Sequence, residues 1–375
     1  MRKTTMMWLL AVLMYCTGLQ AQPKMTMAQI QEKAVKGDPE GQTLLGECLL
    51  SGNGTKRDYT EAVRWFTKAA KQNYPQAQTD LGYCHEAGLG VEKNFKEAVE
   101  WYKKAANQGY APAMNSLGHC YDAGGEGFDK NYAEAVKWYR KAAEKGNAAA
   151  QFNLGSCYYL YKGVDKLDYA EAVKWWTKAA DQGNTTALYH LAHCYKVGEG
   201  VEANAERAFA LYKQAADRRH VMSQYEVSNC YHRGTGVAID EEASLNYLRS
   251  AAEAGYAPAQ LELGKCYDMG KRLEQDYEEA AKWYLKAAKQ ENADAQYNLG
   301  NLYFYGMGVT KDYEEAAKWM EIAAQQEHVG AMCGIGICYY YGYGVKRDRA
   351  VGRQWVNRAA AMGSEYAQEV LKQIK

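Results

Sequence analysis

The sequence has no excess of charge of either sign. Its 375 residues include 45 lysines and arginines and 45 aspartates and glutamates. No cluster of basic residues recurs on one predicted helical face, so the positive surface that nucleic acids require is missing. The composition therefore argues against nucleic-acid binding.

Motifs that would indicate catalysis are also missing. There is no Gly-x-Ser-x-Gly motif, no phosphate-binding loop and no isolated pair of carboxylates in a segment that would form a pocket. Gly-x-Gly occurs often, but no strand precedes it, so it does not indicate a dinucleotide site. We predict no catalytic residues, no cofactor and no enzymatic activity.

The apolar run at the N-terminus, Met6–Tyr15, is shorter than the roughly 20 residues that a membrane helix needs. It follows Arg2 and Lys3 and precedes a short segment with small residues, which is the pattern of a secretory signal peptide. We therefore predict a signal peptide over residues 1–21, cleavage before Gln22, and a protein that is periplasmic or secreted, with no transmembrane segment after cleavage.

A lipoprotein is the less favoured form of export. Cys16 could carry a lipid, but the bulky Tyr15 stands directly before it, where lipoprotein processing sites usually have a small residue.

Cysteine, in contrast, recurs at a fixed spacing. Eight of the ten cysteines lie at one position of a repeat of 36 or 37 residues, and Leu302 fills the one vacant slot. Such a period is typical of stacked two-helix units, each of which buries its apolar face only against a neighbour. The eight are Cys48, Cys84, Cys120, Cys157, Cys194, Cys230, Cys266 and Cys338.

Each repeat contains two segments with helical spacing of apolar residues. In one repeat, Ala77, Leu81 and Cys84 share an arc of the first segment, and Ala98 and Tyr102 share an arc of the second. We call these segments helix A and helix B and predict an all-α fold. The repeats start near residues 38, 75, 111, 148, 185, 221, 257, 293 and 329. No Pro/Ser-rich linker interrupts them, so residues 22–375 are predicted to form a single domain.

The ends of the helices carry their own signals. Helix A is followed by glycine, which adopts the left-handed conformation that ends a helix. Helix B follows Asp or Asn, whose side chains accept bonds from free backbone N–H groups. In several repeats Glu stands three positions later, as in Asp58 and Glu61, which predicts reciprocal capping.

These residues resemble the Sel-one-like repeat (SLR) family, which is related to tetratricopeptide repeats. The pattern Ala…Leu-Gly-x-x-Tyr…Gly-x-Gly-Val…Asp…Glu-Ala…Trp…Ala-Ala…Gly recurs nine times between Asp38 and Gly363. Thr26–Gly37 resembles a lone helix B and Ser364–Lys375 a lone helix A, so half-repeats would cap both ends. The resemblance implies an α/α solenoid that forms a right-handed superhelix, with helix A lining its inner, concave surface.

Two turns depart from this pattern. Tyr161 replaces the first loop glycine of repeat four, and Arg272 replaces the second loop glycine of repeat seven. We expect both turns to differ from the others in backbone shape.

Export would permit disulfides, but geometry favours buried thiols. Equivalent positions on stacked helices lie about 8–10 Å apart, beyond the roughly 7 Å limit between Cα atoms for a bridge. Cys333 and Cys338 point about 140° apart on one helix. Cysteine-rich SLR proteins place a second cysteine inside the repeat, and helix B here has none. We predict that the repeated cysteines belong to the core.

Tryptophan recurs on helix B at a fixed phase. A ladder for ligands is one interpretation, but the periodicity favours packing between units. The seven residues are Trp65, Trp101, Trp138, Trp175, Trp283, Trp319 and Trp355.

The arc of helix A opposite the apolar stripe varies between repeats, as the binding surface of a scaffold would. It carries polar, histidine and aromatic side chains, which suit a peptide or a cell-wall glycan. The predicted partner-binding residues are Tyr83, His119, Phe152, Ser156, Tyr189, His190, His193, Tyr225, Glu226, Asn229, Glu262 and Lys265.

His190 and His193 lie one turn apart, with His119, Glu226 and His232 in other units. A zinc site is the alternative, but such sites need a third ligand in fixed geometry. We predict no metal site and regard these residues as part of a solvated polar surface.

The function that fits best is an exported protein-interaction scaffold that binds a partner polypeptide on the helix A surface. The alternative is a cell-wall-directed protein that binds or weakly hydrolyses peptidoglycan-derived or β-lactam ligands, an activity that the resemblance to cysteine-rich SLR proteins implies.

Overall fold

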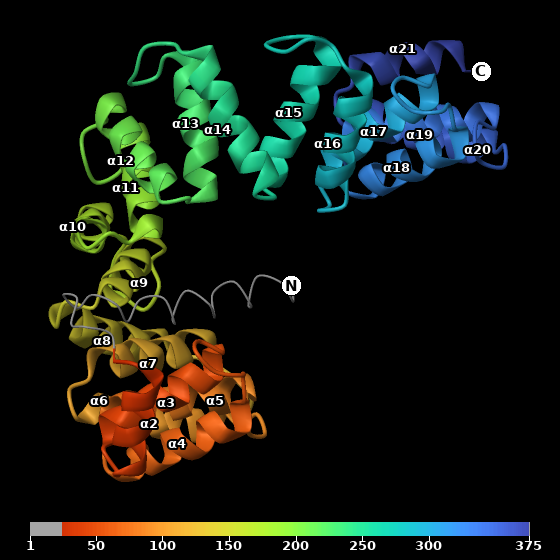
Figure 1. Cartoon of the computed structure of the whole chain (residues 1–375). Helices are drawn as coiled ribbons and strands as arrows, with labels where there is room; N and C mark the ends of the chain where they lie inside the picture. The colour runs from red at the N-terminus through yellow and green to blue at the C-terminus, as the bar shows by residue number, and fades with distance from the viewer. Residues whose placement is uncertain (1–24, 375) are drawn as a thin grey trace. The chain divides into compact units, whose positions relative to one another are not determined.

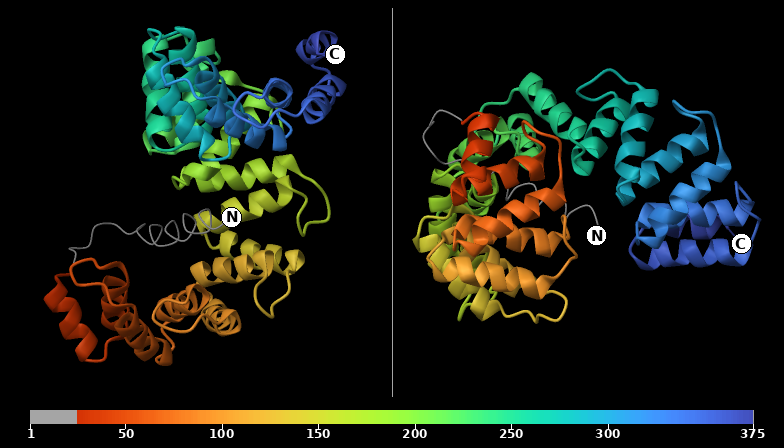
Figure 2. Two further views of the ribbon diagram at one scale, coloured as in Figure 1. Left: turned by 90° about the vertical axis from the view of Figure 1, so that its right-hand side faces the viewer. Right: turned by 60° about the horizontal axis from the view of Figure 1, so that its bottom comes forward.

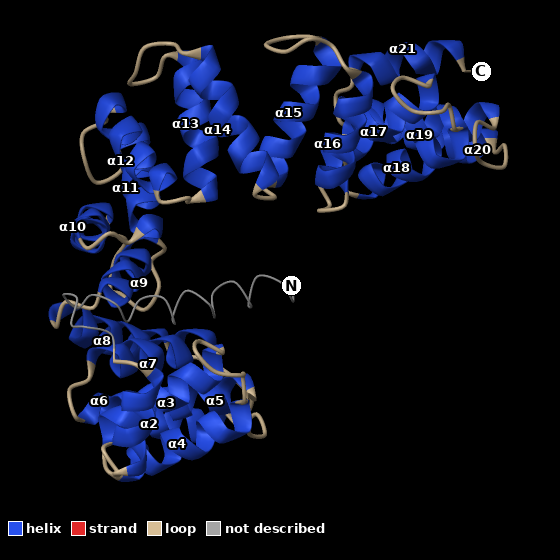
Figure 3. Cartoon of the chain, in the orientation of Figure 1, coloured by secondary structure: helices blue, strands red, loops and turns tan. Residues whose placement is uncertain are grey.

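The computed structural model describes residues 25–374. Within this range the chain forms twenty α-helices joined by loops and no strand (Figure 3). None of these helices is long and apolar enough to cross a membrane. The predicted signal peptide and Cys16 lie outside the described residues.

The chain forms two compact units, the first ending at Asp168 and the second beginning at Tyr169. The boundary lies between the two helices of repeat four, so the repeat pattern runs through it, and the single domain remains a prediction. Unit 1 contains α2 (Met27–Val35), α3 (Pro39–Ser51), α4 (Tyr59–Lys71), α5 (Pro75–Ala87), α6 (Phe95–Asn107), α7 (Ala111–Ala123), α8 (Tyr132–Glu144) and α9 (Ala148–Tyr159).

Unit 2 contains the remaining helices, and successive helices within each unit pack against one another (Figures 1 and 2). They are α10 (Tyr169–Asp181), α11 (Thr185–Val197), α12 (Ala205–Asp217), α13 (Val221–Arg233), α14 (Glu241–Glu253), α15 (Ala257–Met269), α16 (Tyr277–Ala288), α17 (Ala293–Tyr305), α18 (Tyr313–Gln325), α19 (Val329–Tyr341), α20 (Arg349–Ala361) and α21 (Glu365–Gln373). Odd-numbered helices from α3 to α19 are helix A and even-numbered helices are helix B. The all-α solenoid prediction is confirmed.

The predicted helix ends are confirmed, but the reciprocal capping predicted for Asp58 and Glu61 is wrong. Asp58 accepts the backbone N–H of Glu61 at 3.0 Å, as expected for an N-cap. The Glu61 side chain does not return to the cap and instead forms an ion pair with Arg64 at 3.1 Å. A reciprocal capping box does join Thr26 and Gln29 at the start of α2.

The second loop glycine of most repeats packs closely on the backbone of the preceding repeat. A Cβ atom on Gly90 would collide with the backbone oxygen of Tyr59, and Gly90 has φ of 71°. Arg272 keeps the same φ of 71°, and Tyr161 has φ of 52°. Both residues therefore keep the left-handed backbone conformation of the glycines that they replace. In this respect the expectation that these two turns differ in backbone shape is wrong. Bonds from the Arg272 guanidinium to α14 accompany its left-handed conformation.

Helix A and helix B meet where a glycine faces a large ring. A Cβ atom on Gly82 of α5 would lie 2.8 Å from the Tyr102 ring of α6, which is itself buried. Because the residue on helix A is small, the two helices approach closely, and the large side chain of helix B is buried between them. In repeat six, Ser228 takes the place of this glycine and bonds Ser244 of α14.

The thiols lie in the core, as predicted, with one exception. Eight of the nine cysteines in the described chain are buried, and all nine are free. Cys48 is only half-buried. It packs near the single helix α2 at the end of the stack, which covers it less completely than a full repeat would.

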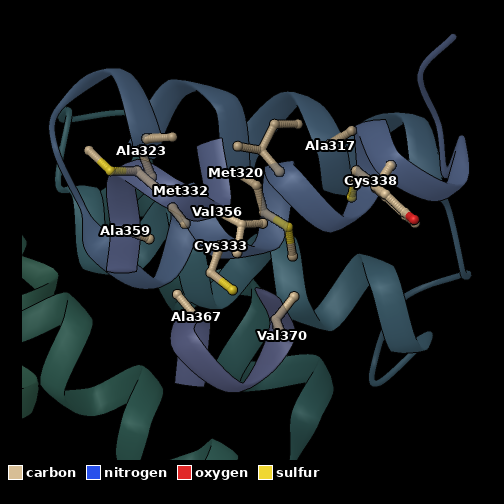
Figure 4. Close-up of a cluster of buried hydrophobic side chains, with 14 of the residues drawn as sticks. Ala317, Met320, Ala323, Met332, Cys333, Cys338, Val356, Ala359, Ala367 and Val370 are labelled. Atoms are coloured by element: carbon tan, nitrogen blue, oxygen red, sulfur yellow. The ribbon is translucent and has the colours of Figure 1, made fainter. Parts of the chain in front are cut away.

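Single helices cap the two ends, as predicted. Thr26 caps the start of α2, and Ser364 accepts the N–H of Ala367 at the start of α21. Figure 4 shows Ala367 and Val370 of α21 directed toward Cys333, within a cluster that includes Val356. The last helix thus covers apolar surface that would otherwise face water.

Candidate functional site

The predicted partner-binding residues lie on helix A, on the side away from the buried Ala, Leu and Cys stripe. Most of them are partly exposed and can therefore contact another molecule. His119 is exposed, and the partly exposed residues are Tyr83, Ser156, Tyr189, His190, His193, Tyr225, Glu226, Asn229, Glu262 and Lys265.

Phe152 differs from this group because it is buried, with 8% of its surface exposed. Its ring belongs to the apolar interior and leaves little surface for a partner. Ser156, one turn later on α9, donates its hydroxyl to the backbone oxygen of Phe152 at 3.0 Å. Of these two residues, Ser156 is the more accessible.

Tyr189 of α11 is the centre of a cluster of rings in unit 2. Its centroid lies 5.4 Å from that of His190, 5.6 Å from that of Tyr212 and 5.4 Å from that of His220. His190 also stacks on Trp176 of α10, with centroids 5.0 Å apart. These contacts link α10 to α13, so Tyr189 supports the packing as well as contributing to the surface.

The histidines of this cluster are held neutral. Burial lowers the pKa of His190 to about 4, and the neighbouring His193 and His220 contribute to the shift. Burial also lowers the pKa of His220. The Nδ1 atom of His220 accepts the backbone N–H of Ser223 and caps α13. At neutral pH this part of the surface is therefore aromatic and polar, with no positive charge from these two imidazoles.

The next helix A, α13, contributes a charged pair and a further ring. Glu226 forms an ion pair with Lys196 of α11 at 2.8 Å. Tyr225 lies edge-on to Tyr256, with centroids 5.5 Å apart. The structure thus brings residues of α11 and α13 together across adjacent repeats, while Glu262 and Lys265 continue the row on α15.

The histidines considered as metal ligands do not converge. His232 pairs with Glu241 of α14 at 2.6 Å. Across residues 25–374 there is no group of three His, Cys, Asp or Glu side chains that could hold a metal ion.

The tryptophans pack between repeats, as predicted, but most remain partly exposed. Trp101 of α6 borders the buried cluster formed by repeats one and two, and Trp319 borders the cluster of repeats seven and eight. The ammonium group of Lys104 lies 3.7 Å from the Trp101 ring centroid, in a cation–π contact. The tryptophan rings therefore pack helix B against its neighbours and hold the lysine side chains beside them.

Sequence patterns did not single out Glu47, which forms a carboxyl pair with Asp80 in unit 1. Gln76 donates to Glu47 Oε1 at 2.6 Å, whereas Asp80 Oδ2 is buried without a hydrogen-bond partner in the described chain. Burial raises the pKa of Asp80 well above its usual value, and the charge of Glu47 adds to the shift. Glu47 is equivalent to Tyr83 in the next repeat, so the period alone could have identified it.

Comparison with known families confirms the predicted resemblance. The Sel1 repeat family matches nine consecutive segments whose starts agree with those predicted. They are residues 39–74, 75–110, 111–147, 148–184, 185–220, 221–256, 257–292, 293–328 and 329–364. A comparison with curated proteins gives no match.

Two solved structures are similar over much of the chain. One is a protective antigen of uropathogenic Escherichia coli that displays an SLR fold. It is 32% identical, with a TM-score of 0.64, over 94% of this chain and 82% of the antigen. The other is a Sel1 repeat protein from Oxalobacter formigenes. It is 34% identical, with a TM-score of 0.59, over 66% of this chain and 96% of that protein.

Proposed function

Because the chain belongs to the Sel1 repeat family, we propose that it is an exported scaffold that binds a partner polypeptide on its helix A surface. Sel1 repeat proteins are generally protein-interaction scaffolds. The observation that carries the proposal is the contrast between the two sides of helix A. One side is buried and mostly apolar, whereas the other carries partly exposed side chains that differ from repeat to repeat.

This variation supports recognition because packing does not account for it. His193, Asn229 and Lys265 occupy equivalent positions in three successive repeats, and all three are partly exposed. A repeat surface whose core is constant and whose exposed row varies can bind an extended partner with specificity. Binding, without a chemical step, is the proposed mechanism.

Export is the second element of the proposal. Its support is the basic N-terminus, the Met6–Tyr15 apolar run and the small residues that end at Ala21. The partner would then be a protein or peptide of the cell envelope or the exterior.

Affinity capture from a cell-envelope fraction tests the proposed function. The mature chain should retain a polypeptide that survives washing, and retention should fall when His193 and Asn229 are both replaced by alanine. A parallel sedimentation assay uses purified cell wall. Retention on cell wall, with no polypeptide captured, would contradict the scaffold and support the cell-wall alternative.

A further inference from the structure

The C-terminal repeats contain a hollow on the helix A surface of unit 2. It has a volume of about 470 Å³ and lies against α15, α17 and the capping helix α21, which Figure 1 shows at the C-terminal end of the chain. Its lining includes Asp268, Tyr297, Asn298, Asn301, Tyr305 and Tyr366.

Two amide groups face this hollow without internal partners. Asn298 and Asn301 lie one turn apart on α17 and are partly exposed. Neither side chain takes part in any hydrogen bond found in the described part of the chain. An asparagine offers both a donor and an acceptor, so two of them in one row can bond successive peptide groups of an extended chain.

The charges at the hollow differ from those at the equivalent positions of the central repeats, five and six. Asn298 is equivalent to Glu226, and Asp268 is equivalent to Lys196. In the central repeats Glu226 and Lys196 neutralise each other in an ion pair. In the hollow the corresponding pair is an amide and a carboxylate, and Asp268 forms no ion pair with any residue of the described range 25–374. Asp268 accepts the Tyr284 hydroxyl at 2.9 Å, and it is the one charged residue in the lining.

Three tyrosine rings form the walls. Tyr305 and Tyr366 are 64% and 66% exposed, and Tyr297 is partly buried against His328. Burial raises the pKa of Tyr366, with smaller contributions from Cys333, Tyr305 and Tyr297. Much of the Tyr366 ring surface nevertheless remains open to a ligand.

We propose that this hollow binds an extended segment of a partner polypeptide in which a lysine or arginine stands next to an apolar or aromatic residue. The asparagines bond the peptide backbone, the tyrosines contact the apolar side chain, and Asp268 attracts the basic one. This inference rests on the proposed function for the class of partner, but it adds a separate site formed by repeats seven and eight and the capping helix α21.

Selection from a phage-displayed library of random peptides on the mature chain provides the probe. We expect the selected peptides to combine a basic residue with a neighbouring apolar or aromatic residue. Binding of a synthetic copy, measured by fluorescence anisotropy, should weaken about ten-fold or more in Asn298→Ala with Asn301→Ala, the scale of hot-spot loss. Asn246→Ala, an exposed asparagine on α14, is the matched control and should bind as the unaltered chain does.

Two further variants keep the test independent of folding defects. Tyr366→Ala changes a largely exposed ring and should weaken the peptide with an unchanged melting temperature. Asp268→Asn retains an acceptor for the Tyr284 hydroxyl. It should weaken the binding of basic peptides and make that binding less dependent on salt concentration.

Three outcomes would overturn the inference. If peptide binding is lost in the variant with His193→Ala and Asn229→Ala but is kept in the hollow variants, the proposed function stands and this site does not. If no peptide is selected and oligomers of N-acetylglucosamine bind instead, the polypeptide partner fails together with the site. If the selected peptides lack basic residues and Asp268→Asn binds them normally, the proposed recognition is wrong.

Discussion

The side-chain amide of Gln326 donates a hydrogen bond of 2.7 Å to Oε1 of Gln296, whose own amide donates to the backbone oxygen of Ala288 at 3.1 Å. Helix A of repeat eight is thereby tied both to its own helix B and to the last turn of the preceding one. Gln108 and Gln78 make the same contact in repeat two at 2.7 Å. Repeat six lacks it, because Ala254 stands where the donor glutamine should be and Gln224 Oε1 is left buried without a partner.

Ala254→Gln should therefore stabilise the protein. The new amide would satisfy Gln224 Oε1, and a typical hydrogen bond contributes about 1 kcal/mol to the free energy of unfolding. Urea denaturation followed by circular dichroism measures the change. Gln290→Ala is the matched control, because it removes the equivalent bond to Gln260 in repeat seven and should destabilise by a similar amount. A destabilised Ala254→Gln variant would show that this contact does not act as described.

The thiols should react in two classes. Burial raises the pKa of Cys84 and of Cys338 to about 12, and neither side chain is accessible. Cys48 is the one half-buried thiol of the described chain and should react with a maleimide in the native state. Mass spectrometry of a chain that begins at Gln22 should show one label before unfolding and nine after it. Disulfides between repeats would contradict this arrangement.

Stability should fall as the pH drops from about 6.5 to 4. The pKa of His190 is about 4 in the folded protein and about 6.5 in an unfolded chain. The folded state thus binds fewer protons in this range, and protonation favours unfolding by up to about 3 kcal/mol. Urea midpoints measured across the range will show the loss.

His190→Gln should flatten this pH dependence, whereas His119→Gln, at an exposed position in unit 1, should leave it unchanged. Identical pH profiles for His190→Gln and the unaltered protein would show that the imidazole is not held neutral by burial.

Export should remove the first 21 residues. N-terminal sequencing of protein recovered from the envelope or the medium should begin at Gln22, since the small residues ending at Ala21 provide the cleavage signal. An intact Met1 would exclude export by this route, and a lipid on Cys16 would replace a released protein with a membrane-anchored one.

Most of the fold could be predicted because its signals are local. An apolar residue such as Cys84 at a fixed phase, a glycine such as Gly88 after helix A and an aspartate such as Asp58 before helix B determine each helix by its own neighbourhood. The glutamine contacts could not be predicted in the same way. Gln78 and Gln108 are 30 residues apart, and an isolated glutamine in a helical pattern is more typical of the surface.

The candidate site was less predictable because exposure depends on neighbours that a single helix does not define. Phe152 shares the phase of Tyr189 but is buried, whereas Tyr189 is partly exposed. The capping helix α21 was predicted, but the repeat pattern does not show that it places Tyr366 beside Asp268 and Tyr305 to form the hollow. Arg272 keeps the left-handed backbone conformation of the glycine that it replaces, and its side chain forms hydrogen bonds to α14. A residue pattern does not reveal these contacts.

The most direct test of the scaffold is the affinity of a captured partner for surface variants. Tyr189 is unsuitable for this test because its ring also packs against the buried Tyr212, so its removal would change stability. His193→Ala with Asn229→Ala changes two partly exposed positions of the row, and Glu144→Ala on the exposed end of α8 is the control.

Isothermal titration calorimetry with the purified partner gives the result. We predict that the double variant weakens binding by about 1–3 kcal/mol, the scale of a hot-spot loss, with its melting temperature nearly unchanged and Glu144→Ala without effect. Equal and small effects of the double variant and Glu144→Ala would contradict a partner-binding helix A surface.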